Sequence, residues 1–79
     1  MTELQIKILR FVALVGDPTF ANIQSHVGLD ADALREPVME LVHGGSLRMT
    51  DDDQEHDWTY RLTQLGRQML AAHAPKPEA

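Results

Sequence analysis

The sequence has no cysteine, and basic residues are scarce in it. Without cysteine, disulfides, thiolate zinc sites and cysteine nucleophiles are all excluded. Only 7 Lys and Arg residues stand against 12 Asp and Glu residues, which gives a formal net charge of −5. A protein with this net negative charge attracts nucleic acid only if its basic groups gather on one face.

Long apolar segments and a leader are also lacking. The longest uncharged apolar run covers residues 11–15, which is far too short to span a bilayer. The N-terminus lacks the basic start and apolar core of a secretion signal, so we expect a soluble, cytoplasmic protein with no membrane partner. A chain of 79 residues forms one domain at most, predicted over 1–73, followed by a disordered tail over 74–79. At this size we do not expect an enzyme.

Three helices are predicted in the first half of the chain. Apolar residues recur at helical spacing over 3–15, where Thr2 can act as the N-cap and Gln5 can complete a capping box. So little of this helix is polar that we expect it to be buried on most sides. A second helix is predicted from a cap at residue 19 to about 27, and a third from a cap at residue 30 to 43. The short turn between them has the spacing of a helix-turn-helix.

The next part of the chain changes from a helical to an alternating pattern. Apolar residues alternate with polar ones over 46–50 and again over 58–62, which predicts two antiparallel strands joined by the polar segment 51–57. Trp58 and Tyr60 are expected to cover the core from the inner face of the second strand.

A last helix is predicted after Thr63, with Leu65, Met69 and Leu70 in its apolar stripe. Pro37 lies inside the third helix, where it predicts a kink because it removes a backbone donor. The fold class is therefore mainly α with a small antiparallel β-sheet, in the order helix, helix, helix, strand, strand, helix.

This order resembles the winged helix-turn-helix. The segments that carry the resemblance are Gly28-Leu29-Asp30 at the turn, Leu41 to Leu47 before the first strand, and Tyr60-Arg61-Leu62-Thr63-Gln64-Leu65-Gly66 after the second. The last of these is similar to the Y-x-L-T-x-x-G that closes the wing in many small bacterial regulators of the MarR and PadR type. The resemblance implies a DNA-binding transcriptional regulator without a cofactor, acting as a homodimer on a two-fold site.

In such regulators the third helix enters the major groove, the second helix contacts phosphates, and the wing touches the flanking backbone or the minor groove. Carried over position by position, the resemblance implies DNA contacts at Asn22, Gln24, Ser25, Asp32, Arg35, Arg48 and Arg61. This sequence departs from the pattern at the third helix, where only Arg35 can make a bidentate contact with guanine.

The segment between the predicted strands supports a second interpretation. It carries five acids, as many as the whole charge excess, and no Lys or Arg lies between Arg48 and Arg61. The alternative function is a winged-helix protein-interaction module that does not bind DNA and docks a basic partner or mimics nucleic-acid phosphates. Its predicted contact residues are Asp51, Asp52, Asp53, Glu55, Asp57 and Trp58. We predict no metal site, because this segment lacks the glycine and final glutamate of a calcium loop and the four histidines lack zinc-ligand spacing.

Overall fold

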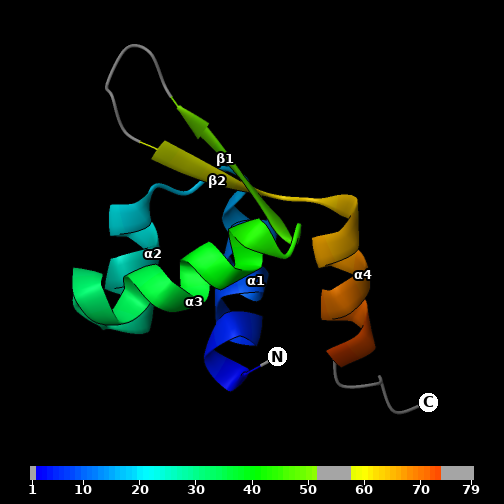
Figure 1. Ribbon diagram of the computed structural model, residues 1–79, viewed down its shortest axis with the longest axis horizontal. Coiled ribbons are helices and arrows are strands. Elements are labelled where there is room, and N and C mark those ends of the chain that lie inside the picture. The colour runs from blue at the N-terminus through cyan, green and yellow to red at the C-terminus, as the bar shows by residue number, and fades with distance from the viewer. Residues whose placement is uncertain (1, 52–57, 74–79) are drawn as a thin grey trace.

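A computed structural model describes residues 2–51 and 58–73 of the protein. Its elements are α1 (Glu3–Val15), α2 (Phe20–Val27), α3 (Ala31–His43), β1 (Leu47–Asp51), β2 (Trp58–Leu62) and α4 (Gln64–His73) (Figure 1). The predicted order and fold class are confirmed. The predicted disordered tail over 74–79 and the acidic residues 52–57 lie outside the described residues.

Side-chain caps start the first three helices where the sequence predicted them. The backbone N–H of Gln5 donates to Thr2 Oγ1 at 3.2 Å, and the N–H of Thr2 donates back to Gln5 Oε1 at 3.0 Å. Thr19 and Asn22 form a second reciprocal box at the start of α2, with both distances 3.1 Å. Asp30 Oδ1 accepts from a backbone N–H of α3 at 2.7 Å. Each cap satisfies donors that the first turn of a helix leaves without intrahelical partners.

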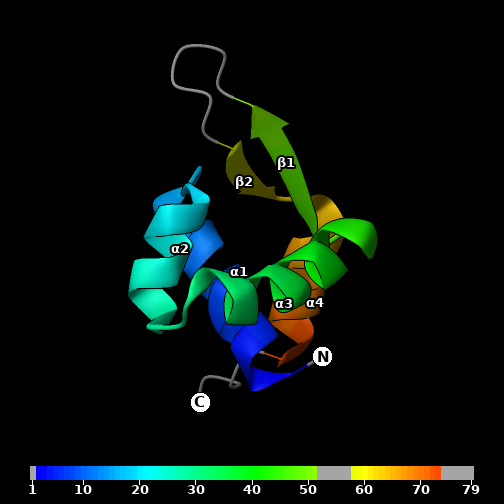
Figure 2. The same cartoon turned by 60° about the vertical axis from the view of Figure 1, so that its left-hand side comes forward.

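The core is built around α1, which contacts each of the other helices and β2. Figures 1 and 2 show α2 and α4 on opposite sides of α1, with the sheet at one end of the helices. Buried apolar side chains come from α1, α2, α3 and both strands, and they are Ile8, Leu9, Val12, Ile23, Leu34, Val38, Leu41, Leu47, Tyr60 and Leu62.

The two strands form an antiparallel hairpin that is fixed to the helices along one edge. In its register Leu47 pairs with Leu62 and Asp51 pairs with Trp58. The backbone N–H of Tyr60 donates to the carbonyl of Pro18 at 3.0 Å, and Thr19 and Thr59 form an isolated bridge. The segment before α2 thus contacts the edge of β2 through one isolated bridge and one backbone hydrogen bond, which orient the wing relative to the helix-turn-helix.

Three expectations about burial are wrong. The C-terminal end of α1 is not buried, since Leu14 is 84% exposed and Val15 is 51% exposed. Trp58 is 49% exposed and lies outside the core, unlike Tyr60 on the same strand. Leu65 is 44% exposed, because the turn of α4 that meets the core presents a buried glycine instead. The sequence patterns predicted the helix and strand periods correctly. They could not show which turns of each element pack against the core.

The helix α3 is continuous past Pro37, which therefore does not end it. Thr63 begins α4 as predicted, because its Oγ1 accepts from the backbone N–H of Gly66 at 3.0 Å. Among the described residues, no helix has the length and apolar character needed to cross a membrane.

Candidate nucleic-acid interface

The turn between α2 and α3 depends on a left-handed residue. Gly28 has φ 74° and ψ 26°, a conformation that a side chain disfavours, and its N–H donates to the carbonyl of Gln24 at 2.8 Å. On either side of this turn, Ile23 of α2 and Leu34 and Val38 of α3 are fully buried. The two helices are thereby held together as a helix-turn-helix, and the opposite face of α3 is left to solvent.

The residues of α2 that the sequence predicted as DNA contacts are only partly available. Asn22 is exposed, but its side chain is already bonded to Thr19 in the capping box. Ser25 is exposed and Gln24 is half-buried. The capping box uses only the Oδ1 of Asn22, so its amide N–H groups and the Ser25 hydroxyl can both donate to a phosphate.

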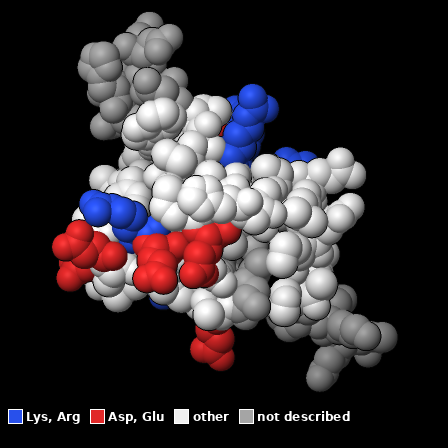
Figure 3. Space-filling view, viewed as in Figure 1, with Lys and Arg blue, Asp and Glu red and all other residues white. Residues whose placement is uncertain are grey.

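The exposed face of α3 is acidic. Asp32, Glu36 and Glu40 are each exposed and lie four residues apart, so they follow one side of the helix and form what we call the acidic stripe. Figure 3 shows the acidic groups together over the position of α3. Arg35, the predicted base-reading residue, lies 3.8 Å from Asp32 through its Nη1, and both side chains are strongly exposed at 68% and 92%. Such an exposed pair at this distance is weak.

The outer face of the wing carries two arginines side by side. Arg48 and Arg61 are cross-strand partners, and both are exposed. Thr50 and Thr59 are partners on the same face, with their hydroxyl oxygens 2.6 Å apart. The structure thus brings Arg48 and Arg61 together, on a face that points away from the buried side of the sheet.

Arg61 is anchored by Asp17, which is 44 positions away in the sequence. Its Nε donates to Asp17 Oδ1 at 2.9 Å, and its Nη2 donates to Asp17 Oδ2 at 3.1 Å. This bidentate hydrogen bonding lowers the pKa of Asp17 and raises the pKa of Arg61. The pair joins the loop after α1 to the wing, and it offsets the repulsion between two adjacent arginines.

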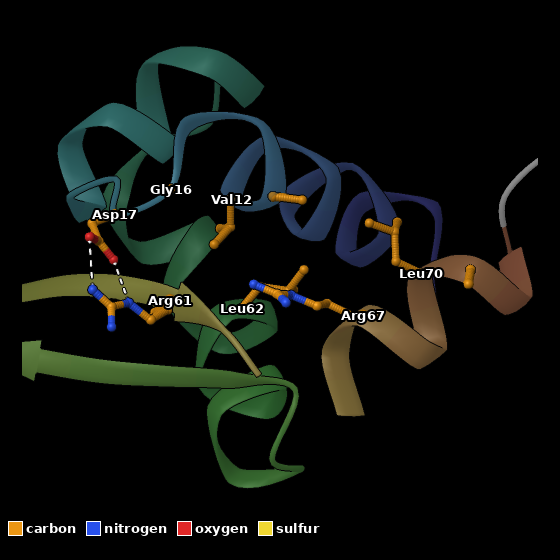
Figure 4. Close-up of a pocket in the computed structure, with 9 residues that line it drawn as sticks. Val12, Gly16, Asp17, Arg61, Leu62, Arg67 and Leu70 are labelled. Atoms are coloured by element: carbon orange, nitrogen blue, oxygen red, sulfur yellow. Dashed lines mark hydrogen bonds and ion pairs between the residues drawn. The ribbon is translucent and has the colours of Figure 1, made fainter. Parts of the chain in front are cut away.

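A cavity of about 610 Å³ lies where α1, β2 and α4 meet (Figure 4). Val12, Leu62 and Leu70 supply apolar walls, and the Asp17–Arg61 pair lies at one side. Arg67 extends from α4 toward β2, so a third arginine joins the base of the wing. Sequence reasoning missed both Asp17 and Arg67. Asp17 gave no signal because it is 44 positions from its partner, whereas Arg67 could have been noticed one helical turn after the Thr63 cap.

The structure describes few of the residues predicted for the alternative interface. Asp52, Asp53, Glu55 and Asp57 lie outside the described residues, and for Asp51 only the strand position is described. Trp58 is half-exposed, as an interface anchor would be. Within residues 2–51 and 58–73 no group of acids and histidines is arranged to hold a metal ion.

The helix-turn-helix, the two-stranded wing and the closing helix define a winged helix-turn-helix domain. Three solved structures share this fold. MarR from E. coli is 19% identical, with a TM-score of 0.85 over 91% of this chain and 54% of MarR. The PcaV transcriptional regulator from Streptomyces coelicolor is 25% identical, with a TM-score of 0.86 over 90% of this chain and 53% of PcaV. A mutant MarR from E. coli, solved in complex with operator DNA, is 19% identical, with a TM-score of 0.84 over 91% of this chain and 52% of that protein.

The likeness establishes the fold, and the predicted resemblance to MarR-type winged helices is confirmed. No protein-family model matches the chain, and no curated protein matches it. The chain spans about half the length of the solved structures that it matches.

Proposed function

We propose that this protein is a DNA-binding domain of a transcriptional regulator and is not an enzyme. The observation that carries the proposal is the match of 91% of the chain to a MarR protein that was solved with operator DNA. The helix-turn-helix and wing that such a complex requires are both present, and α3 has a fully solvent-facing side. The predicted homodimer and the cytoplasmic location belong to the same proposal.

The predicted DNA contacts fall into two groups. One comprises the helix residues Asn22, Gln24, Ser25, Asp32 and Arg35, and the other comprises the wing residues Arg48 and Arg61. Conventional docking would use both groups, with α3 in the major groove and the wing against the flanking backbone. In that arrangement Arg35 is the single residue of α3 able to read guanine.

The test is fluorescence anisotropy of a labelled mixed-sequence duplex titrated with the protein at about 0.05 M and then about 0.2 M salt. We expect binding at low salt that falls with salt, because phosphate contacts release counterions. Absence of binding at low salt and high protein concentration would contradict the proposal. Sequence-specific DNA binding also depends on non-specific attraction between the protein and the phosphates. Single-stranded DNA of the same sequence serves as the control for duplex preference.

The alternative of a protein-interaction module has less support. The neighbours described above are transcriptional regulators, and they do not favour it. Its acidic contact residues lie largely outside the described residues, so no geometry supports their docking a partner. Neutralising Asp51, Asp52 and Asp53 distinguishes the DNA-binding proposal from this alternative. DNA binding should strengthen if the proposal is right, whereas binding of a basic partner should weaken if the alternative is right.

A further inference from the structure

Charge is segregated between two parts of the described surface. The first turns of α3 and its acidic stripe contribute four acids, Asp30, Asp32, Glu36 and Glu40, against the single base Arg35. The acids and bases of α3 and its cap therefore sum to −3, although the described residues as a whole carry seven acids and six bases. Figure 3 shows these acidic groups gathered over α3, apart from the basic groups next to the sheet.

The base of the wing has the opposite charge. Arg48 and Arg61 are cross-strand partners, and Arg61 and Arg67 line the same cavity. We call these three residues the wing-base patch. All three are exposed, and Asp17 is the acid paired with one of them. With Asp17 included, the patch sums to +2.

We propose that duplex DNA is held through its phosphates by the wing-base patch, with the acidic stripe of α3 turned away from the backbone. This inference rests on the proposed function and identifies which of its surfaces makes the contact. A helix in the major groove has phosphates on both sides, and at such range its three uncompensated carboxylates would repel them.

The outer face of the wing also has the right donors for a phosphate backbone. Arg61 uses Nε and Nη2 for Asp17, which leaves Nη1 without a hydrogen bond to any other described residue. Arg48 has no acidic partner within the described part of the chain. The hydroxyls of Thr50 and Thr59 lie beside these guanidinium groups on the same face. Arginine forks and hydroxyls are common phosphate ligands.

This docking carries a consequence for selectivity. Contacts to phosphates fix position and orientation but contain no direct information on base sequence. We therefore expect the domain alone to bind duplexes of different sequence with similar affinity, because Arg35 is then removed from the groove.

The experiment compares four charge-removing variants by anisotropy with the same mixed-sequence duplex. Arg48→Gln and Arg67→Gln test the wing-base patch, and Arg35→Gln and Glu36→Gln are the matched variants on α3. Each changes an exposed side chain, and circular dichroism with thermal melting checks that the fold is kept.

Losing one phosphate contact should weaken binding roughly tenfold at about 0.05 M salt and reduce the salt slope by about 0.9. We expect this loss for both patch variants. The α3 variants should change Kd by less than about twofold, because their side chains would then contact no phosphate and salt weakens the interaction between more distant exposed charges.

Two results would overturn the inference, and they are distinguishable. If the wild-type protein binds but Arg35→Gln weakens and Glu36→Gln strengthens binding while the patch variants match the wild type, α3 docks in the groove and the proposed function survives. If the wild-type protein binds no duplex at low salt, the proposed function itself fails and the inference falls with it.

Discussion

Gly66 of α4 lies directly against the backbone of Ser46, which precedes β1. A Cβ at Gly66 would overlap the Ser46 carbonyl oxygen and would lie 2.8 Å from Leu62 Cδ1. The same carbonyl accepts from the backbone N–H of Thr63 at 3.1 Å, and the single hydroxyl proton of Thr63 is shared between the carbonyls of Gly45 and Ser46. The close approach of two backbones thus joins the entry of the wing to its exit, and it explains why the third residue of α4 is a glycine.

Replacing Gly66 with alanine should destabilise the fold. The added methyl meets a backbone carbonyl that the N–H of Thr63 holds in place, so overpacking should cost about 1–3 kcal/mol in free energy of unfolding. Urea denaturation followed by circular dichroism measures the change. Gln68→Ala, at an exposed position of the same helix, is the matched control and should stay within about 0.5 kcal/mol of the wild type. Equal stability of both variants would show that α4 does not pack against Ser46 as described.

The sequence predicted the elements well because the signals for them are local. The capping residues Thr2, Thr19 and Asp30 and the change from helical to alternating period are all readable within a few positions. Leu65 shows the limit of that reasoning. It continues an apolar stripe in the sequence, yet the adjacent Gly66 makes the contact with the body because another backbone occupies that space.

The candidate site was predicted only in part. The resemblance to the winged helix implied Arg35, Arg48 and Arg61 as contact residues, and all three are exposed in the structure. It could not indicate that Arg61 pairs with Asp17 or that Arg67 joins the base of the wing, because those contacts depend on how α1, β2 and α4 meet. The residues of the acidic stripe can be read from the sequence. Their effect on DNA docking can be inferred only when the position of the basic wing-base patch is also known.

The Asp17–Arg61 pair should make part of the stability depend on acid pH. The hydrogen bond from Arg61 lowers the pKa of Asp17 below its ordinary value of 3.8. Folding therefore gains stability from the ionised carboxylate above that value, and this gain is lost as pH falls through the lowered folded-state pKa. Thermal melts of wild type and Asp17→Asn from pH 6 to about pH 2 measure the effect. The difference between the two proteins should shrink toward the acid end, and a difference independent of pH would contradict the assignment.

At the N-cap of α3, the stabilising effect of a negative charge can be measured separately from that of the capping hydrogen bond. Asp30 Oδ1 accepts from the N–H of Ala33, and asparagine can make the same bond with its amide oxygen. We expect Asp30→Ala to lose about 1 kcal/mol in free energy of unfolding, while Asp30→Asn retains most of it. Chemical denaturation of the three proteins checks this order. Equal losses in both variants would mean that the carboxylate charge at the helix N-terminus, and not the cap, supplies the stabilisation.

The predicted homodimer can be tested at the exposed end of α1. Two apolar surfaces are candidates for it, the exposed end of α1 and the Met69–Leu70 edge of α4. Met69 is partly buried, and its sulfur accepts from Ser46 Oγ at 3.3 Å, so it is occupied within the protomer. Leu14 is 84% exposed and is therefore the better candidate for an apolar contact between copies. Sedimentation velocity across a concentration series measures self-association.

We expect Leu14→Gln to raise the dimer dissociation constant by about tenfold, which corresponds to about 1.4 kcal/mol of lost contact. Its free energy of unfolding as a monomer should hardly change, because the side chain makes little contact within the protomer. Leu65→Gln, at 44% exposure on α4, serves as the control for simple loss of an exposed leucine. An equal effect of both substitutions would place the interface across α1 and α4 together. A wild-type protein that stays monomeric at every concentration would contradict the homodimer, and each domain would then occupy DNA independently.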